Sequence, residues 1–462
     1  MPPTPTDYFI GLDLGTTSVK ACAFNRDGKM LGESSREYPL LHPAAGAAVQ
    51  EPQVLVSAAE ESLVELIKQL DEKPAGIGLS CPMHGLILYN EHWRPVTPII
   101  TWADVRAQSV MEEFSPTDRR KLLRITGTPV HPMSPLVKLR WLARKHPQVI
   151  NFSHYCYGIK EVLTGTWTKT PTLDEQLASA NGMYDSGKGR WSVTALQIAS
   201  GLNEAEYAKR GLPLGLPPVR PATHRLEWKE EVAERLGLTD VPLFLGGSDG
   251  VLANLGSGLL SPGEVALTVG TSGAVRTTHR QARIDPKHGL FNYKMFQDYY
   301  VIGGATNNGG KVLEYWQGLL SAHFKDIGAF IEAALSVKSE NSPQFQPYLF
   351  GERAPLWDAN AKAELNGLRG HHDHRHLARA VLDGVTDNLV VILRQLEAAV
   401  GPARRIHASG GFTQSPAWLG LLAEKAGREV IVTNNPQASA YGAALIARLG
   451  LGDLSLEELL PS

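Results

Sequence analysis

The stretch Leu243–Val275, LFLGGSDGVLANLGSGLLSPGEVALTVGTSGAV, contains the two features that decide the predicted fold. It begins with a short apolar run, which predicts one buried strand. That strand leads through Gly246 and Gly247 to Asp249. A carboxylate that follows a buried strand on a glycine-rich backbone can approach a ligand closely. Asp249 is therefore a candidate base, although Gly-Ser-Asp-Gly also suits an ordinary turn.

The second feature is a polar turn after another apolar strand. This strand is expected at Glu264–Val269, and the turn is Gly270-Thr271-Ser272-Gly273. Free backbone N–H groups and two hydroxyls in such a turn suit a phosphate. Taken alone the turn is a weak signal, and the rest of the chain has to decide its role.

The beginning of the chain repeats this pattern. Tyr8–Leu14 predicts a strand, and Gly15-Thr16-Thr17-Ser18 forms a polar turn that aligns with the turn at Gly270. Two such turns on two domains are typical of a nucleotide clamp, whereas a duplicated hairpin could also be purely architectural. Asp13 aligns with Thr268, so only the first copy carries an acid inside an apolar strand. A buried carboxylate needs a cation, and Mg²⁺ suits one beside a phosphate loop; Asp13 could instead cap the turn.

Composition excludes several classes of protein. The chain has 462 residues, 43% of them hydrophobic and 20% charged, which predicts a globular protein with two or more domains. A net charge of −2 gives no strong case for binding nucleic acid or an anionic membrane. The three cysteines are widely spaced and odd in number, which favours a reducing compartment. Met1–Asp7 does not read as a secretory signal, and no apolar run reaches the roughly 18 residues of a membrane span, so we expect a cytoplasmic protein.

Polar side chains follow two further predicted strands, Gly76–Ser80 and Pro98–Thr101. These strand ends deliver His84, Trp102, Asp104 and Arg106. Loops at strand ends carry ligand contacts in α/β proteins. A ring face, an acceptor and a forked donor suit a polyol, but Asp104 and Arg106 could equally form a surface ion pair beside a core tryptophan.

The rest of the chain alternates strands and helices. Helices are expected at Val54–Leu70 and Arg375–Val400, each with one apolar face. The polar segment Asp174–Gly182, DEQLASANG, is interpreted as a structured loop. The domain boundary is placed near Leu245, giving domains 1–245 and 246–462. The sequence contains no G-x-G-x-x-G, Walker A, H-E-x-x-H or G-x-S-x-G motif.

Together these segments resemble the FGGY carbohydrate kinases of the actin/hexokinase-like superfamily, and the resemblance covers essentially the whole chain. Gly11–Lys20 and Thr268–Gly273 resemble the two phosphate motifs. Met133–Leu142 resembles the first family signature, and Glu364–Asp383 resembles the second. Ser409-Gly410-Gly411 and the segment from Pro436 resemble the adenosine-binding part.

The resemblance implies an α/β fold of two ribonuclease H-like domains with a deep cleft between them, and it implies roles residue by residue. Asp249 matches the base that takes a proton from the sugar hydroxyl and contacts the substrate, and Asp13 matches the acid that holds Mg²⁺. His84, Trp102, Asp104 and Arg106 match the sugar-contacting loops. The implied nucleotide contacts are Thr16, Thr17, Lys20, Gly270, Thr271, Ser272, Gly310, Gly410, Gly411 and Gln414.

Within the family, several phrases are most similar to gluconate kinases, among them Asn307-Asn308-Gly-Gly and Gly351–Trp357, and xylulokinases come second. The resemblance implies ATP-dependent phosphorylation of D-gluconate to 6-phosphogluconate with Mg²⁺, on a small-molecule substrate and with a possible homodimer. A gluconate carboxylate needs cations, and Arg106, Lys138, His84 and His131 are the candidates. Xylulose or another polyol or ketose is the alternative acceptor, and a non-catalytic ATP-binding sugar sensor is a distant one.

Overall fold

The computed structural model describes residues 8–210, 214–433 and 435–460. The segment Met1–Asp7 lies outside the described residues. Contacts divide the chain into two compact units. The first unit is formed by Met1–Leu260, Asn292–Tyr300 and Asn435–Ser462, and the second by Ser261–Phe291 and Val301–Asn434.

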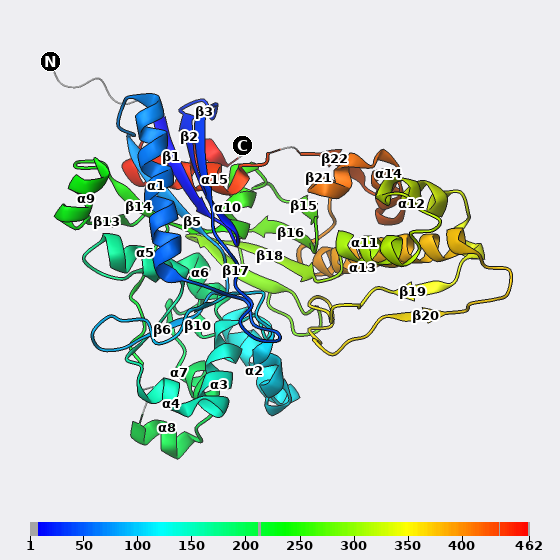
Figure 1. Ribbon diagram of the computed structural model, residues 1–462, viewed down its shortest axis with the longest axis horizontal. Coiled ribbons are helices and arrows are strands. Elements are labelled where there is room, and N and C mark those ends of the chain that lie inside the picture. Colours follow the sequence, from blue (N-terminus) through cyan, green and yellow to red (C-terminus); the bar gives the residue numbers. More distant parts are fainter. Residues whose placement is uncertain (1–7, 211–213, 434, 461–462) are drawn as a thin grey trace. The chain divides into compact units, whose positions relative to one another are not determined.

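A six-stranded sheet organises the first unit (Figure 1). Its order is β13 (Arg225–Leu226), β14 (Leu243–Ser248), β5 (Gly76–Cys81), β1 (Tyr8–Leu14), β2 (Ser18–Asn25) and β3 (Met30–Glu37). Strands β1, β5 and β14 run parallel to one another, so their carboxyl ends meet at one edge of the sheet. This edge carries the residues that follow Leu14, Cys81 and Ser248.

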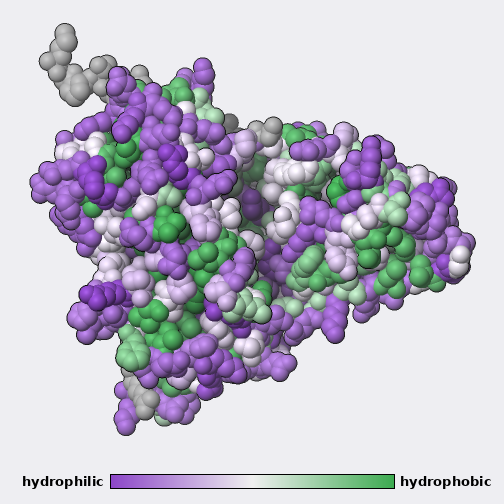
Figure 2. Space-filling view, viewed as in Figure 1, coloured by the Kyte–Doolittle hydropathy of each residue, from purple (hydrophilic) through white to green (hydrophobic). Residues whose placement is uncertain are grey.

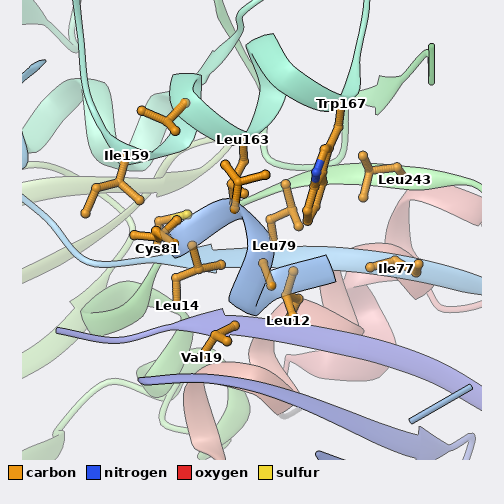
Figure 3. Packing of buried hydrophobic residues seen from close by; sticks show 14 of the residues in the cluster. Leu12, Leu14, Val19, Ile77, Leu79, Cys81, Ile159, Leu163, Trp167 and Leu243 are labelled. Atoms are coloured by element: carbon orange, nitrogen blue, oxygen red, sulfur yellow. The ribbon is translucent and has the colours of Figure 1, made fainter. Parts of the chain in front are cut away.

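The main core of the first unit lies between this sheet and two helices, α1 (Pro52–Leu70) and α5 (Ile159–Trp167). Figure 3 shows Leu12, Leu79 and Leu243 of three neighbouring strands beneath Leu163 and Trp167 of α5. Alternate residues of β1 face this core, because successive side chains of a strand point to opposite faces.

Helix α15 (Ala438–Leu451) covers the opposite face of the same sheet. Its backbone lies so close that a Cβ on Gly11 would be 1.8 Å from the Ala440 carbonyl oxygen. A Cβ on Gly78 would similarly be 2.0 Å from the Ala443 carbonyl oxygen. Glycine is thus required at both positions for α15 to pack on the strands.

The remaining part of the first unit is built of short elements, some of which surround a second apolar cluster. Its helices are η1 (Arg106–Glu113), α2 (Pro116–Thr126), α3 (Pro135–Lys145), α4 (Pro147–Asn151), α6 (Glu175–Ala180), α7 (Val193–Ser200), α8 (Glu204–Arg210), α9 (Glu230–Leu236) and α10 (Asp249–Gly256). Its strands are β4 (Val49–Gln50), β6 (Ile87–Tyr89), β7 (Ile99–Ile100), β8 (Tyr155–Tyr157), β9 (Leu173–Asp174), β10 (Tyr184–Asp185), β11 (Arg190–Trp191) and β12 (Val219–Arg220).

The second unit repeats the strand order of the first. The second six-stranded sheet has the order β17 (Phe291–Phe296), β18 (Tyr299–Thr306), β16 (Gly273–His279), β15 (Glu264–Val269), β21 (Arg405–Ser409) and β22 (Glu429–Val432). Both sheets contain an antiparallel hairpin, β1–β2 in the first and β15–β16 in the second. In each, the first strand of the hairpin also pairs with a later strand in parallel, β1 with β5 and β15 with β21. The repeat expected from the two Gly-Thr turns is therefore confirmed at the level of topology.

The remaining helices of the chain are α11 (Gly310–Leu319), α12 (Ile327–Leu335), α13 (His374–Val400), α14 (Pro416–Ala426) and the C-terminal α16 (Leu456–Leu459). The remaining short elements are the strands β19 (Gln344–Gln346) and β20 (Glu364–Asn366) and the 3-10 helices η2 (Ser339–Asn341) and η3 (Gly411–Gln414). Helix α13 matches the predicted apolar stripe closely, and Val385, Leu389 and Ile392 are fully buried. Ser415 caps α14 by accepting a hydrogen bond from Trp418 N, as its sequence predicts.

Two features of the chain differ from the expectations. The segment Asp174–Gly182 is not a loop, because Glu175–Ala180 forms the buried helix α6. The compact units also differ from a division at residue 245, since α10 and α15 both pack in the first unit. A Cβ on Gly256 of α10 would be 2.0 Å from the Ala438 carbonyl oxygen, a close approach that joins these two helices.

Hydrophilic residues cover most of the face seen in Figure 2. Within the described part of the chain, no helix combines the length and the apolar character that crossing a bilayer requires.

Candidate active site

The two acids singled out in the sequence lie at the same edge of the first sheet. Asp13 of β1 pairs with Ser80 of β5, and Ser80 pairs with Gly247 of β14. Asp249 directly follows the end of β14. Neighbouring strands are about 4.8 Å apart, so the backbones of Asp13 and Gly247 are separated by roughly 10 Å, and Asp249 follows Gly247 by two residues.

Asp13 is a largely buried carboxylate with two polar neighbours. Ser80 Oγ donates a hydrogen bond to Asp13 Oδ1 at 2.5 Å, and Lys20 lies opposite Asp13 across the β1–β2 ladder. Burial raises the pKa of Asp13, while the Ser80 hydrogen bond and the Lys20 charge lower it. No group of three or more His, Cys, Asp or Glu side chains in the described ranges is arranged to hold a metal ion.

Asp249 is the first residue of α10. Its Oδ1 accepts a hydrogen bond from Gly250 N at 2.7 Å, and its carbonyl oxygen accepts one from Ser439 Oγ at 3.1 Å. The N-terminus of a helix carries a partial positive charge, which stabilises a carboxylate at this position. The sequence context of Asp249 therefore produces an oriented carboxylate at the end of a buried strand.

The first Gly-Thr turn contacts the tryptophan expected in the sugar loops. Trp102 Nε1 donates to Thr16 Oγ1 at 3.0 Å, and Gln50 Nε2 donates to the Thr16 carbonyl oxygen at 2.7 Å. The Trp102 ring remains 37% exposed, and Thr17 beside Thr16 is exposed as well. The structure thus joins the loop after β7 to the turn after β1.

Asp104 and Arg106 form an ion pair with each other. Asp104 is only 1% exposed, and its carboxylate accepts from Arg106 Nε and Nη2 and from Ala48 N. The Arg106 guanidinium also lies 4.8 Å from the centre of the Trp141 ring. This geometry favours the ion-pair alternative over direct sugar contact, because the acceptors of Asp104 are already used inside the protein.

His84 and Lys138 connect the two loops. His84 has a positive φ of 67°, and its ring lies edge-on to Tyr293 with centroids 6.1 Å apart. Lys138 is fully buried, and its ammonium donates to the carbonyl oxygens of His84, Ile100 and Thr101 at 2.5, 3.2 and 2.7 Å. Burial lowers the pKa of Lys138 to about 7. All three donors of Lys138 are engaged by backbone, so this residue is removed from the candidates for a substrate carboxylate.

The second unit contains a pocket of about 490 Å³ beside the second Gly-Thr turn. Five of the residues assigned to the nucleotide line it, namely Gly270, Thr271, Gly310, Gly411 and Gln414. A Cβ on Gly270 or Gly411 would meet no atom within 4 Å, so both face open space. The sequence did not indicate the apolar wall of this pocket, which is formed by Leu313, Ile327, Ile331, Phe412 and Trp418.

Backbone contacts fix the polar end of this pocket. Gly270 N donates to the Ser272 carbonyl oxygen at 2.9 Å, and Gly310 N donates to the Gly270 carbonyl oxygen at 2.7 Å. Gly410 has a φ of 96°, and a Cβ there would be 2.4 Å from the Val269 carbonyl oxygen. Helix α11 begins at Gly310, so its N-terminus is at the pocket. Glycine-lined backbone and a helix N-terminus together suit phosphate oxygens.

A buried carboxylate in the second unit was also missed. Glu352 is fully buried and accepts hydrogen bonds from Thr306 Oγ1, Asn308 Nδ2 and Asn388 Nδ2 at 2.7, 3.2 and 2.9 Å. It joins the Asn307-Asn308 turn, which precedes α11, to the segment 351–357. Only the similarity of these two segments to gluconate kinases pointed to them, and nothing in the sequence indicated that they touch.

The two matching sheets have the fold of the actin/hexokinase-like carbohydrate kinases. Residues 8–256 match the N-terminal domain of the FGGY family of carbohydrate kinases, and residues 265–451 match its C-terminal domain. The chain belongs to the FGGY family and is a carbohydrate kinase.

Individual relatives carry two kinds of name. The chain is 34% identical to gluconokinase of Bacillus licheniformis, with 97% of this chain and 88% of the relative covered. It is 28% identical to xylulose kinase of Lactococcus lactis, with 96% and 88% covered. The structure of gluconate kinase from Lactobacillus acidophilus superposes with a TM-score of 0.89 at 32% identity, covering 98% of this chain and 91% of that one. A ligand-bound xylulose kinase structure from Lactobacillus acidophilus gives the same values.

Proposed function

We propose that this kinase transfers the terminal phosphoryl group of ATP to the C6 hydroxyl of D-gluconate, giving 6-phosphogluconate and ADP. The observation that carries the reaction type is the presence of Asp13 and Asp249 at the carboxyl ends of β1 and β14, the two parallel strands that flank β5 in one sheet. The choice of acceptor is supported by the 34% identical gluconokinase, whose similarity extends over 97% of this chain.

The residues of the second unit fit a nucleotide. The apolar wall at Ile331 and Trp418 suits an adenine ring, and the open faces of Gly270 and Gly411 leave room for close approach of the ligand to the backbone. We assign the phosphates to the two Gly-Thr turns, with Thr271 and the α11 N-terminus in the second unit and Thr16, Thr17 and Lys20 in the first.

The donor set at Asp13 fits Mg²⁺. Mg²⁺ in phosphoryl-transfer sites takes one or two carboxylates and otherwise water and phosphate oxygens. Asp13 supplies one such carboxylate, which burial leaves in need of a cation. When bound, the metal would neutralise charge on the phosphates.

Asp249 is assigned as the general base. It accepts the proton of the acceptor hydroxyl while the hydroxyl oxygen forms its bond to the γ-phosphorus and the bond to ADP breaks. General-base assistance contributes about 10²–10⁴-fold, so Asp249→Asn should lose most turnover and keep ATP binding. Near-normal turnover of that variant would remove Asp249 from the mechanism.

On the sugar side we assign direct contacts to His84 and Trp102. We assign Asp104 and Arg106 to stabilising the loop that carries Trp102, because the carboxylate of Asp104 already accepts hydrogen bonds from Arg106 and Ala48 N. Lys138 fixes the same loop through its three backbone carbonyls. A substrate carboxylate would therefore not be paired with Lys138.

A xylulose kinase is the second candidate, because a 32% identical structure bears that name. ATP consumption measured side by side with gluconate, xylulose, ribulose and glycerol decides between them. A kcat/KM for xylulose above that for gluconate would overturn the assignment of the acceptor but not of the reaction. The homodimer and the cytoplasmic location expected from the sequence stay predictions; light scattering tests the former.

A further inference from the structure

Strand β14 is irregular immediately before Asp249. Its pairing with β5 shifts register between Phe244 and Gly247. Gly246 at the shift has a φ of 67°, and a Cβ there would lie 1.7 Å from the Leu79 carbonyl oxygen. Such a bulge takes backbone groups out of the ladder and changes the direction of the residues that follow. The direction of Asp249 therefore depends on what holds this bulge.

A fully buried lysine of α5 binds the bulge from one side. Lys160 Nζ donates to the Leu245 carbonyl oxygen at 2.5 Å and lies 3.4 Å from the carbonyl oxygens of Gly247 and Leu79. Its charge is balanced by the fully buried Asp174, whose Oδ2 is 3.4 Å away. Asp174 Oδ1 in turn accepts from Leu177 N and caps α6.

A fully buried glutamine of α6 binds the next residues of the strand. Gln176 Oε1 accepts a hydrogen bond from Ser248 N at 3.0 Å, and Gln176 Nε2 donates to the Met295 carbonyl oxygen at 2.9 Å. A Cβ on Gly247 would be 2.0 Å from Gln176 Oε1, so the amide lies directly against the strand backbone. Both of its polar ends are used by backbone, which leaves its donor and acceptor satisfied in the interior.

We propose that Gln176, supported by the Lys160–Asp174 pair, is a positioning residue that holds the bulged end of β14 and thereby orients Asp249. The inference rests on the proposed role of Asp249 as the base. Gln176 accepts a hydrogen bond from the backbone N–H of Ser248, the residue directly before Asp249. A misplacement of a reacting group by about 1 Å can lower a rate about 10²-fold, so a single backbone hydrogen bond at this point has a large effect on turnover.

The test is a double-mutant cycle on kcat, which separates positioning of Asp249 from a general structural role. Gln176→Met keeps the size of the side chain and removes both hydrogen bonds. We expect it to lower kcat about 10–100-fold, with the KM for ATP changed by less than about twofold. In the Asp249→Asn background the same substitution should lower kcat by less than about threefold, because there is no base left to position. An equal loss in both backgrounds, or near-normal kcat in Gln176→Met, overturns the proposal.

Two further variants keep the test decisive. Gln176→Glu retains an acceptor for Ser248 N, and only its protonated carboxyl can also donate to the Met295 carbonyl oxygen, so it should recover part of the kcat lost in Gln176→Met. Gln176→Asn withdraws the amide by one methylene group; it should behave as Gln176→Met does, and it replaces that variant in the cycle if Gln176→Met fails to fold. Gln317→Met is the matched control, since Gln317 Nε2 also donates to a backbone carbonyl, that of Phe324 at 2.8 Å, in the second unit.

The two failures are distinguishable. Asp249→Asn with near-normal kcat refutes the base assignment and with it the proposed function of this residue. A large loss in Asp249→Asn combined with an additive effect of Gln176→Met refutes only the positioning role. Urea unfolding of each variant, and ATP binding measured by calorimetry, show whether a lost rate reflects lost fold; a Gln176→Met loss accompanied by lost ATP binding also counts against positioning.

Discussion

The buried carboxylate of Glu352 provides the most quantitative prediction. It accepts hydrogen bonds from the side chains of Thr306, Asn308 and Asn388, none of which is more than 4% exposed. Removing the carboxylate takes away the acceptor of Thr306 Oγ1 and Asn307 N, whereas Asn308 Nδ2 and Asn388 Nδ2 still donate to the Gly351 carbonyl oxygen and to Thr306 Oγ1. A buried polar group without a partner costs about 1–3 kcal/mol, so the two donors set an upper range of roughly 2–6 kcal/mol. Water entering the vacated space satisfies part of this demand, and we expect Glu352→Ala to lose about 3–5 kcal/mol of unfolding free energy.

Glu352→Gln keeps the volume of the side chain, so it tests the charge and the hydrogen-bond geometry of Glu352 separately from its size. In Glu352→Gln one carboxylate oxygen becomes an NH₂ group, and both oxygens of Glu352 accept only from N–H and O–H donors. Either orientation of the amide therefore places donor against donor. We expect a loss of about 2–3 kcal/mol for Glu352→Gln, although its volume is unchanged.

A functional effect should accompany the loss of stability. The turn that Glu352 holds precedes Gly310, where α11 begins at the proposed nucleotide pocket. We expect the KM for ATP to rise about tenfold or more in Glu352→Gln, while the KM for the sugar changes little. Urea unfolding measures the loss of stability, and it is followed by hydrogen exchange in α11 so that the second unit is observed. Steady-state kinetics measures the KM values for ATP and for the sugar.

The control is Glu340→Gln. Glu340 is exposed and forms a surface ion pair with Lys338 at 3.6 Å, so no change in stability or KM is expected. The reasoning is refuted if Glu352→Ala unfolds at the same urea concentration as the unsubstituted protein, or if stability falls while the KM values for ATP and sugar rise together.

Three further predictions concern the first unit. Asp13→Asn keeps an acceptor for Ser80 but removes the charge, and should lower kcat about 10²-fold or more and raise the Mg²⁺ concentration required; an unchanged Mg²⁺ titration would contradict the assigned metal role. Lys138→Met frees the carbonyl oxygens that fix the loops of His84 and Trp102, and should raise the KM for sugar about tenfold with that for ATP unaltered, whereas equal rises would point to a general structural defect. Burial raises the pKa of Glu161 from 4.5 to about 7, so the folded state keeps a proton that the unfolded state has released, and this contribution to stability is lost as pH rises from about 4.5 through 7. Glu161→Gln should remove up to roughly 3 kcal/mol of that pH dependence, as measured by urea unfolding between about pH 5 and 8; a curve with the original slope would show that another group titrates.

Local features were predictable wherever the pattern of one segment carries the information. The strand–turn–strand repeats around Gly15 and Gly270, the long stripe of α13 and the cap at Ser415 all follow from residues close in the chain. Asp13 was also identified in this way, because a charge inside an apolar strand stands out from its neighbours. The assigned roles of the site residues remain predictions that the variants above test.

Helix α6 was missed for the opposite reason. Its residues are polar or small, and such a segment reads as solvated unless its partners are known. In the folded protein Gln176 and Asp174 are fully buried, because the peptide of Ser248 and the ammonium of Lys160 satisfy them. These partners are 72 and 14 residues away along the chain.

The sequence alone thus determined the elements with a periodic apolar pattern, the repeated turns and the acids at the strand ends, since these depend on periodicity and on neighbouring residues. Only the tertiary structure decided that α15 packs on the first sheet at Gly11, that Asp104 forms an ion pair with Arg106 in the interior, and that a bulge precedes Asp249. The physical reason is that a buried polar group is stable only with a specific partner, and that partner is selected by the packing of distant segments rather than by any local pattern.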